Sequence, residues 1–125
     1  MNAQLGRLVI YTKRVSEMAN FYCKYFGYEA HEQDGDRLIE LRPALSGITL
    51  LLHPAGKGQK MGQALIKLVF DIQDVDQFCA DATVQGLQFG PIHQADGYSF
   101  ANTKDPSNNS VSVSSRAFAS SEPTE

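Results

Sequence analysis

The chain has 125 residues, a hydrophobic fraction of 42% and a formal net charge of −3, which is the composition of one ordinary globular domain. The acidic balance argues against a nucleic-acid partner, because phosphate binding usually requires a basic surface. No apolar run approaches the roughly 18 residues of a membrane span, and the first residues lack a secretory signal pattern. Cys23 and Cys79 form no CxxC motif, so we expect a reduced, cytoplasmic protein with two buried, unreactive thiols.

The first expected element is a strand over residues 7–12, because apolar and polar positions alternate there. The alternation places Arg7, Val9 and Tyr11 on one face. A helix should follow from about residue 16 to residue 25, since apolar residues recur at four-residue spacing, and Gly27 should end it.

Strands follow this helix. Asp34-Gly35 separates "YEAHEQ" from "DRLIEL", which predicts a hairpin because both turn residues favour positive φ. A last strand, "ITLLLH" at residues 48–53, closes a unit of one strand, one helix and three strands.

The phrase "RLVIYTKRV" at Arg7 is repeated as "KLVFDIQDV" at Lys67, which indicates a second copy of the unit. The strand over residues 67–72 should be followed by a helix that Asp74 caps, since Asp74 and Gln77 have capping-box spacing. This helix should run to about Gln85 and end at Gly86.

The second copy also continues as strands. Asp96-Gly97 predicts a hairpin between "FGPIHQA" and "YSFANT", and "SVSVSS" at residues 110–115 predicts the last strand. By alternation, one face of this module carries Lys67, Val69 and Asp71, and the serines of the last strand share it. Among those serines is Ser112.

These elements predict one α+β domain over residues 1–115. Module one covers about residues 5–55 and module two residues 63–115, and residues 56–62 are a Gly/Lys/Gln linker. The polar residues 116–125 should form a disordered tail. Each module is a βαβββ unit, and the two should form a curved, cup-shaped mixed eight-stranded sheet with helices on the outer face.

Two segments carry a family resemblance. "FYCKYFGYE" (residues 21–29) and "KDPSNNSVSV" (residues 104–113) resemble segments of the vicinal oxygen chelate superfamily, which includes glyoxalase I, bleomycin-resistance proteins and extradiol dioxygenases. Asn108 stands where the family usually has glycine, and asparagine tolerates the left-handed turn conformation.

In metal-using members, the resemblance implies a divalent ion bound by histidines in the first and fifth strands and by glutamates in the fourth or eighth. The matching positions here are Arg7, Lys67, Ser112 and either Leu50 or Leu51. Arginine and lysine offer no lone pair at neutral pH, and two cations repel a divalent ion. We therefore expect no metal and no cofactor. His31, His53 and His93 lack metal-ligand spacing, and His53 is the one nearest the expected position.

The first functional hypothesis is a metal-independent protein that binds a small aromatic or anionic ligand in the hollow, as bleomycin-resistance proteins do, and that forms a homodimer. Cations and flat apolar side chains would line the hollow. The residues expected there are Arg7, Val9, Tyr11, Leu50, His53, Lys67, Val69, Asp71, Tyr98, Phe100 and Ser112. In the competing interpretation, Arg7 and Lys67 only neutralise acids such as Asp71 or Glu40.

Two enzymatic alternatives stay open. One is a metal-dependent lyase, isomerase or dioxygenase with an atypical site, such as His53 with Asp71 or Glu40. The other is metal-free acid–base chemistry, in which Tyr11 or His53 carries the proton and Arg7 or Lys67 stabilises an oxyanion. "GKGQKMG" at residues 56–62 lacks the order of a phosphate-binding loop, so we interpret it as a linker.

Overall fold

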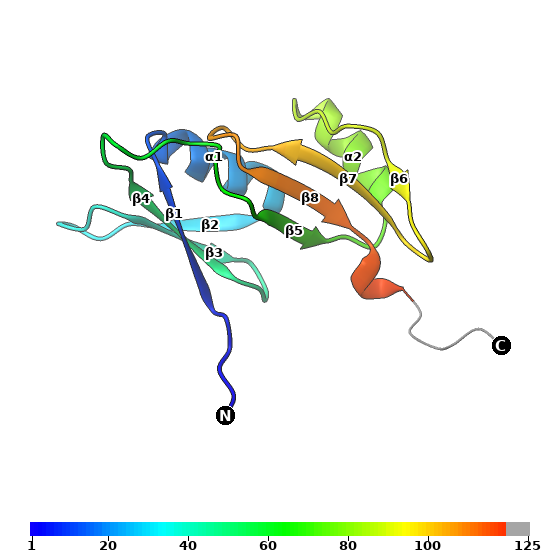
Figure 1. Ribbon diagram of the computed structural model, residues 1–125, viewed down its shortest axis with the longest axis horizontal. Coiled ribbons are helices and arrows are strands. Elements are labelled where there is room, and N and C mark those ends of the chain that lie inside the picture. The colour runs from blue at the N-terminus through cyan, green and yellow to red at the C-terminus, as the bar shows by residue number, and fades with distance from the viewer. Residues whose placement is uncertain (120–125) are drawn as a thin grey trace. The chain divides into compact units, whose positions relative to one another are not determined.

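The computed structural model describes residues 1–119 (Figure 1). The chain divides into two compact units. Unit 1 contains Met1–Ala64 and the short segment Asp105–Asn108, and unit 2 contains Leu65–Lys104 and the residues from Asn109 on. The two units correspond to the two expected modules, with the difference that Asp105–Asn108, inside the bounds of module two, groups with unit 1.

Unit 1 is a four-stranded sheet with one helix. Its elements are β1 (Arg7–Thr12), α1 (Val15–Phe26), β2 (Tyr28–His31), β3 (Ile39–Pro43) and β4 (Thr49–Pro54). The strand order is β1-β4-β3-β2, in which β1 runs parallel to β4 and the other pairs are antiparallel. Helix α1 packs against β2, β3 and β4 (Figure 1). The core between them contains Met18, Tyr22, Leu41, Leu50 and Leu52.

Unit 2 repeats this topology. Its elements are β5 (Lys67–Asp71), α2 (Val75–Val84), β6 (His93–Gln94), β7 (Ser99–Lys104) and β8 (Ser110–Ser114). The strand order is β5-β8-β7-β6, with β5 parallel to β8. The buried residues of α2 and of the sheet form the core, which contains Val75, Cys79, Ala82, Ala101, Val111 and Val113. The α+β class and the two βαβββ modules are therefore confirmed.

The predicted helix ends have a clear local cause. Gly27 caps α1 with φ 71°, a left-handed conformation that side chains with a Cβ disfavour. At the start of α2, the Asp74 carboxylate accepts a 3.0 Å hydrogen bond from the backbone N–H of Gln77, so the predicted N-cap is confirmed. The Gln77 side chain instead donates to Asp81 at 2.8 Å.

Both predicted Asp-Gly turns are present, with a different backbone from the one expected. Gly35 and Gly97 have φ of 82° and 84°. Within residues 1–119, however, Asn108 is the one non-glycine residue with positive φ, so Asp34 and Asp96 keep negative φ. Each turn therefore needs one left-handed residue, which glycine supplies at low cost.

Two other expectations change. The strand expected from "FGPIHQA" is reduced to two residues, because Pro91 has no N–H to donate to a sheet. The expected disordered tail begins with a 3₁₀ helix, Arg116–Phe118, while residues 120–125 lie outside the described residues. No helix within residues 1–119 is long and apolar enough to cross a membrane. The joining of the two sheets around a shared hollow stays a prediction.

Candidate functional site

One face of the unit 1 sheet packs against α1, and the expected binding residues of β1 lie on the opposite, open face. Val9 is 45% exposed and Tyr11 is 51% exposed, and Arg7 is exposed beside them. The register pairs Arg7 with Thr49, Val9 with Leu51 and Tyr11 with His53. Because paired residues of neighbouring strands share a face, Leu51 and His53 of β4 belong to the open face as well.

This register corrects one expected site residue. Leu50 is 2% exposed and pairs with Leu8 and Leu41, whose side chains point toward the helix. Leu51 is half-buried and pairs with Val9 on the open face. Of the two candidates for the fourth-strand position, Leu51 is therefore the accessible one, and Leu50 is a core residue.

An acid that the sequence suggested as a neutralising partner or as a ligand of an atypical metal site lies in the middle of this face. Glu40 of β3 pairs with Leu51, and its carboxylate accepts a 3.3 Å hydrogen bond from Arg42. The Arg42 hydrogen bond, together with the positive charges of Arg42 and Arg7, holds the pKa of Glu40 below its usual value. The interpretation that Arg7 neutralises an acid thus gains support in unit 1.

His53 and Tyr11 are neighbours at the end of the open face that lies away from Arg7. Their ring centroids are 5.2 Å apart. The His53 ring donates from Nδ1 to the Pro54 carbonyl at 2.9 Å, so the neutral ring keeps its lone pair on Nε2. This arrangement orients His53 but brings no carboxylate to it within the contacts of the described residues.

The open face of unit 2 carries the other expected residues. Lys67 and Asp71 are exposed, Val69 is 53% exposed, and the register places Ser110, Ser112 and Ser114 beside them. Ser112 is only 2% exposed because its small side chain lies low between β5 and β7, where its hydroxyl donates to the Ala101 carbonyl at 3.0 Å. The serine positions predicted from alternation are confirmed, since Val111 and Val113 are fully buried on the helix side.

Aromatic rings gather at one end of the unit 2 face. His93 stacks on Phe100 with a centroid distance of 5.0 Å and an interplanar angle of 29°. Tyr98 lies 6.3 Å from Phe100, and the Arg116 guanidinium lies 5.6 Å from the Tyr98 ring centroid. Together, His93, Tyr98 and Phe100 form what we name the aromatic shelf.

The residues at the family's metal positions do not fit a divalent ion. Those positions hold Arg7, Lys67, Leu51 and Ser112, of which none is an imidazole or a carboxylate. A tightly bound metal needs several such donors. In residues 1–119, no group of three or more His, Cys, Asp or Glu side chains is placed to hold a metal ion. The proposed combination of His53 with Glu40 therefore lacks a third ligand in the described part of unit 1.

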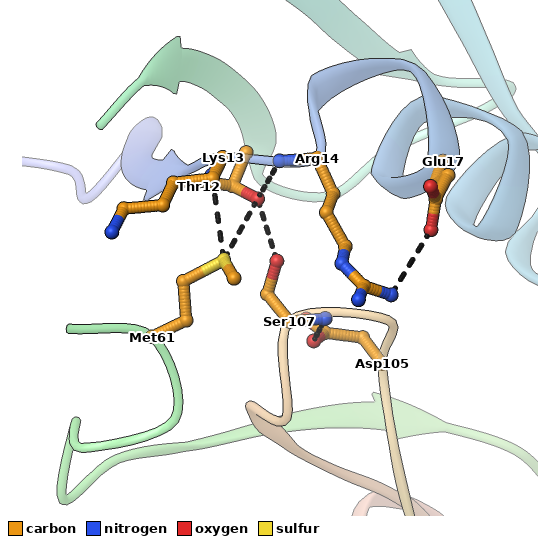
Figure 2. Close-up of polar contacts among 7 residues, drawn as sticks. All are labelled: Thr12, Lys13, Arg14, Glu17, Met61, Asp105 and Ser107. Carbon is orange, nitrogen blue, oxygen red and sulfur yellow. Dashed lines mark hydrogen bonds and ion pairs between the residues drawn. The ribbon is translucent and has the colours of Figure 1, made fainter. Parts of the chain in front are cut away.

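Unit 1 also contains a buried polar cluster that the sequence did not indicate (Figure 2). The Thr12 hydroxyl shares a 2.5 Å hydrogen bond with the Ser107 hydroxyl, accepts from the Arg14 N–H and donates to the Met61 sulfur. Nearby, the Tyr22 hydroxyl donates to the Asp105 carboxylate at 2.8 Å. Burial and the negative charge of Asp105 raise the pKa of Tyr22 far above its usual value, so Tyr22 stays a proton donor.

A surface depression of about 470 Å³ lies next to this cluster. It is lined by residues 12–17, Pro54 and Ala55. None of the residues expected to bind ligand lines this depression, and its polar side chains are mostly exposed. The Arg14–Glu17 ion pair at its rim is 3.3 Å long and solvated (Figure 2), so we assign the depression no ligand.

The comparisons with known proteins agree with this geometry. The profile of the Glyoxalase/Bleomycin resistance protein/Dioxygenase superfamily matches residues 4–113. The chain belongs to this superfamily. The resemblance found in the two sequence segments is thereby confirmed, and the family's match covers both units. Among curated proteins, no sequence matches the chain significantly.

Several solved structures share the fold at low identity. TnmS3, an antibiotic binding protein from Streptomyces sp. CB03234, superposes with a TM-score of 0.75 at 17% identity over 90% of this chain and 94% of its own. Lactoylglutathione lyase from Agrobacterium tumefaciens gives 0.71 at 18% identity, over 94% and 97%. A glyoxalase/bleomycin resistance protein from Streptomyces sp. CB03234 gives 0.69 at 18%, over 88% and 98%. At such identities these similarities show the fold alone.

Proposed function

We propose that this superfamily member binds a small organic ligand, aromatic or anionic, on the open faces of its sheets, without a metal. The observation that carries the proposal is the set of residues at the family's metal positions, Arg7, Lys67, Leu51 and Ser112, which suit an organic ligand and not a divalent ion. TnmS3, which has the same fold, is an antibiotic binding protein.

The composition of the open faces supports this function. Ligand sites combine apolar surface with a few placed polar groups. Here the apolar part is supplied by Val9, Tyr11, Leu51, Val69 and the aromatic shelf. The exposed polar part is supplied by Arg7, Lys67 and Asp71, with His53 beside Tyr11.

Exposed apolar residues on these faces also support a homodimer, because large apolar side chains on a sheet surface commonly mark an interaction site. Val9, Tyr11 and Val69 are each about half exposed. Light scattering coupled to size exclusion checks this part of the proposal, and a monomer at micromolar concentration contradicts it. We retain a cytoplasmic location as a further part, supported by the free cysteines Cys23 and Cys79.

Ligand binding is tested by a thermal-shift and ligand-observed NMR screen of small aromatic acids, neutral aromatics, aromatic amines and antibiotics. A binder whose resonances shift residues of the open faces supports the proposal. A panel without any binder overturns it.

Metal independence is tested separately by elemental analysis of protein purified without chelator. We expect Ni, Zn, Fe and Mn each far below one equivalent, because the four family positions lack imidazole and carboxylate donors. One equivalent of any of these metals, lost on dialysis against chelator together with ligand binding, would instead favour the atypical metal site.

A further inference from the structure

The two sheets differ at one pair of equivalent positions. In unit 1, Val9 of β1 pairs with Leu51 of β4, which in turn pairs with Glu40 of β3. In unit 2, Val69 of β5 pairs with Ser112 of β8, which in turn pairs with Asn102 of β7. Val9 and Val69 are matching residues of the repeat, so Asn102 occupies in unit 2 the place that Glu40 occupies in unit 1.

The cations around this position are equivalent as well. Arg7 lies two residues before Val9, and Lys67 lies two residues before Val69. Each is on the open face of its own unit, together with that valine. Arg42 and Lys104 each lie two residues after the central position, on β3 and β7. Each face therefore places two basic side chains around one central polar side chain.

In unit 1 the charges balance. The Glu40 carboxylate accepts from Arg42 at 3.3 Å and is also stabilised by the charge of Arg7. Glu29 pairs with Arg42 across β2 and β3, so a second carboxylate lies on the same face. The two arginines thus have two acidic neighbours, and the positive charge of Arg7 is already compensated by these carboxylates.

In unit 2 the central acid is replaced by a neutral amide. Lys67 Nζ donates to Asn102 Oδ1 at 3.0 Å, and Lys104 Nζ donates to Ser110 Oγ at 2.9 Å. The one carboxylate on β5, Asp71, lies four residues beyond Lys67, about 13 Å away along an extended strand. Within residues 1–119, no ion pair involves Lys67 or Lys104, so two ammonium groups flank a position that is ready for an anion.

The aromatic shelf lies near this position. Phe100 precedes Asn102 by two residues on β7 and points to the same face, which places it about 7 Å away along the strand. His93 stacks on Phe100 and extends the shelf. Between the shelf and the lysines, β8 contributes only the small side chains of Ser112 and Ser114, which leave room for a flat molecule.

We propose that the open face of unit 2 binds carboxylates that carry an aromatic ring. The ligand carboxylate lies between Lys67, Asn102 and Lys104, and the ring lies on the aromatic shelf. This inference rests on the proposed function and gives the two units different roles. The ligand carboxylate takes in unit 2 the place that the Glu40 carboxylate fills in unit 1. The spacing of about 7 Å favours an acid joined to its ring by a short chain.

Three probes and four variants of the full chain test this inference. The probes are 3-phenylpropionate, neutral 3-phenylpropanol and propionate, which lacks the ring, each titrated by NMR. We expect 3-phenylpropionate to bind at least tenfold more tightly than either analogue, with shifts at residues 67–71, 98–104 and 110–114. Asn102→Glu, which copies the acid of unit 1, should weaken binding at least tenfold, because the new carboxylate occupies the anion position.

The comparison variants separate this effect from a change in net charge or in folding. Lys57→Gln lowers the net charge by the same amount as Asn102→Glu and lies in the linker, so it should change affinity less than twofold. Lys67→Gln changes an exposed side chain and cannot disturb the core. It should weaken the binding of 3-phenylpropionate at least five times more than Arg7→Gln does. The melting temperature of each variant identifies any that fails to fold.

The outcomes distinguish this inference from the proposed function. If neutral or amine-bearing aromatics bind the open faces better than 3-phenylpropionate, or if Asn102→Glu and Lys67→Gln leave the affinity unchanged, the inference is wrong and the proposed function stands. If propionate binds as tightly as 3-phenylpropionate, the role of the aromatic shelf is wrong. If no compound of the wider screen binds, both proposals fail.

Discussion

At the scale of single residues, the best-defined interaction of unit 1 joins two side chains that are 83 residues apart in the chain. The Tyr22 hydroxyl donates to Asp105 at 2.8 Å, and both residues are buried. We predict that Tyr22→Phe lowers the free energy of unfolding by about 1.5–3 kcal/mol, because it removes a hydrogen bond from a buried carboxylate. Urea denaturation followed by circular dichroism measures this loss.

Tyr11→Phe is the matched control for that substitution. Tyr11 is 51% exposed, and its hydroxyl has no hydrogen bond within residues 1–119, so the change should stay within about 0.5 kcal/mol. Equal effects of the two substitutions would show that the Tyr22 hydroxyl contributes nothing specific.

The two thiols are predicted to be slow nucleophiles. Burial raises the pKa of Cys23 and of Cys79, with nearby carboxylates adding to the effect, so at pH 8 the folded protein holds less thiolate than the unfolded chain. We expect iodoacetamide to label both cysteines more slowly in the native protein than in urea, and buried Cys79 more slowly than half-buried Cys23. Mass spectrometry of quenched samples gives both rates. Native Cys79 reacting as fast as in urea contradicts this prediction.

At the scale of elements, the turns depend on particular glycines to different degrees. Gly62 has φ 78°, and a Cβ built on it would lie 2.9 Å from the Cβ of Asn108, an atom that its own backbone holds in place. Gly97 has φ 84° but an open surrounding. Gly97→Ala should therefore cost only the left-handed conformation, about 1–2 kcal/mol, while Gly62→Ala should cost more because the backbone must also move.

Urea unfolding of the two glycine variants side by side checks this difference. Both substitutions add the same methyl group to a left-handed residue, so the extra loss in Gly62→Ala isolates the contact with Asn108. An equal or larger loss in Gly97→Ala would falsify the assignment of that contact as tight.

The elements show why sequence patterns located the faces of the strands but left their partners open. Alternation alone placed Arg7, Val9 and Tyr11 on one face, since the side-chain period of a strand is fixed by its backbone. It could not choose between Leu50 and Leu51, because β4 is apolar on both faces and only pairing with Val9 decides the register. The Asn102–Glu40 equivalence likewise needs the register of three strands in each unit.

At the scale of the whole molecule, the repeat predicted the two βαβββ modules, while the contacts of the folded chain group Asp105–Asn108 with unit 1. That segment joins β7 to β8 of unit 2 and nevertheless belongs to unit 1, where Ser107 contacts Thr12 and Asp105 contacts Tyr22. No sequence period encodes such contacts, because they depend on which distant side chains meet. A family resemblance marked "KDPSNNSVSV" as a motif without revealing its partners.

This exchange of a segment means that residues 1–64 lack part of their own core. A fragment ending at Ala64 lacks Asp105, and the loss of the hydrogen bond between the Tyr22 hydroxyl and this buried carboxylate costs about 1.5–3 kcal/mol. The hydroxyl of Thr12 also loses Ser107. A chain of this length is close to the lower limit for a stable domain. We predict that the fragment is largely unfolded at 25 °C, as judged by the dispersion of its amide NMR signals.

Tyr22→Phe tests whether the hydrogen bond to Asp105 is what fragment 1–64 lacks. In the full chain the substitution removes the hydrogen bond to Asp105 and destabilises, whereas in fragment 1–64 that bond is already absent. The substitution should therefore lower the stability of the fragment by less than it lowers the stability of the full chain. Urea unfolding of the full chain and refolding of the fragment in the stabilising osmolyte TMAO, each with and without Tyr22→Phe, measure the two changes in stability. A loss of stability of the same size in both backgrounds would show that Tyr22 acts through packing within residues 1–64 and not through Asp105.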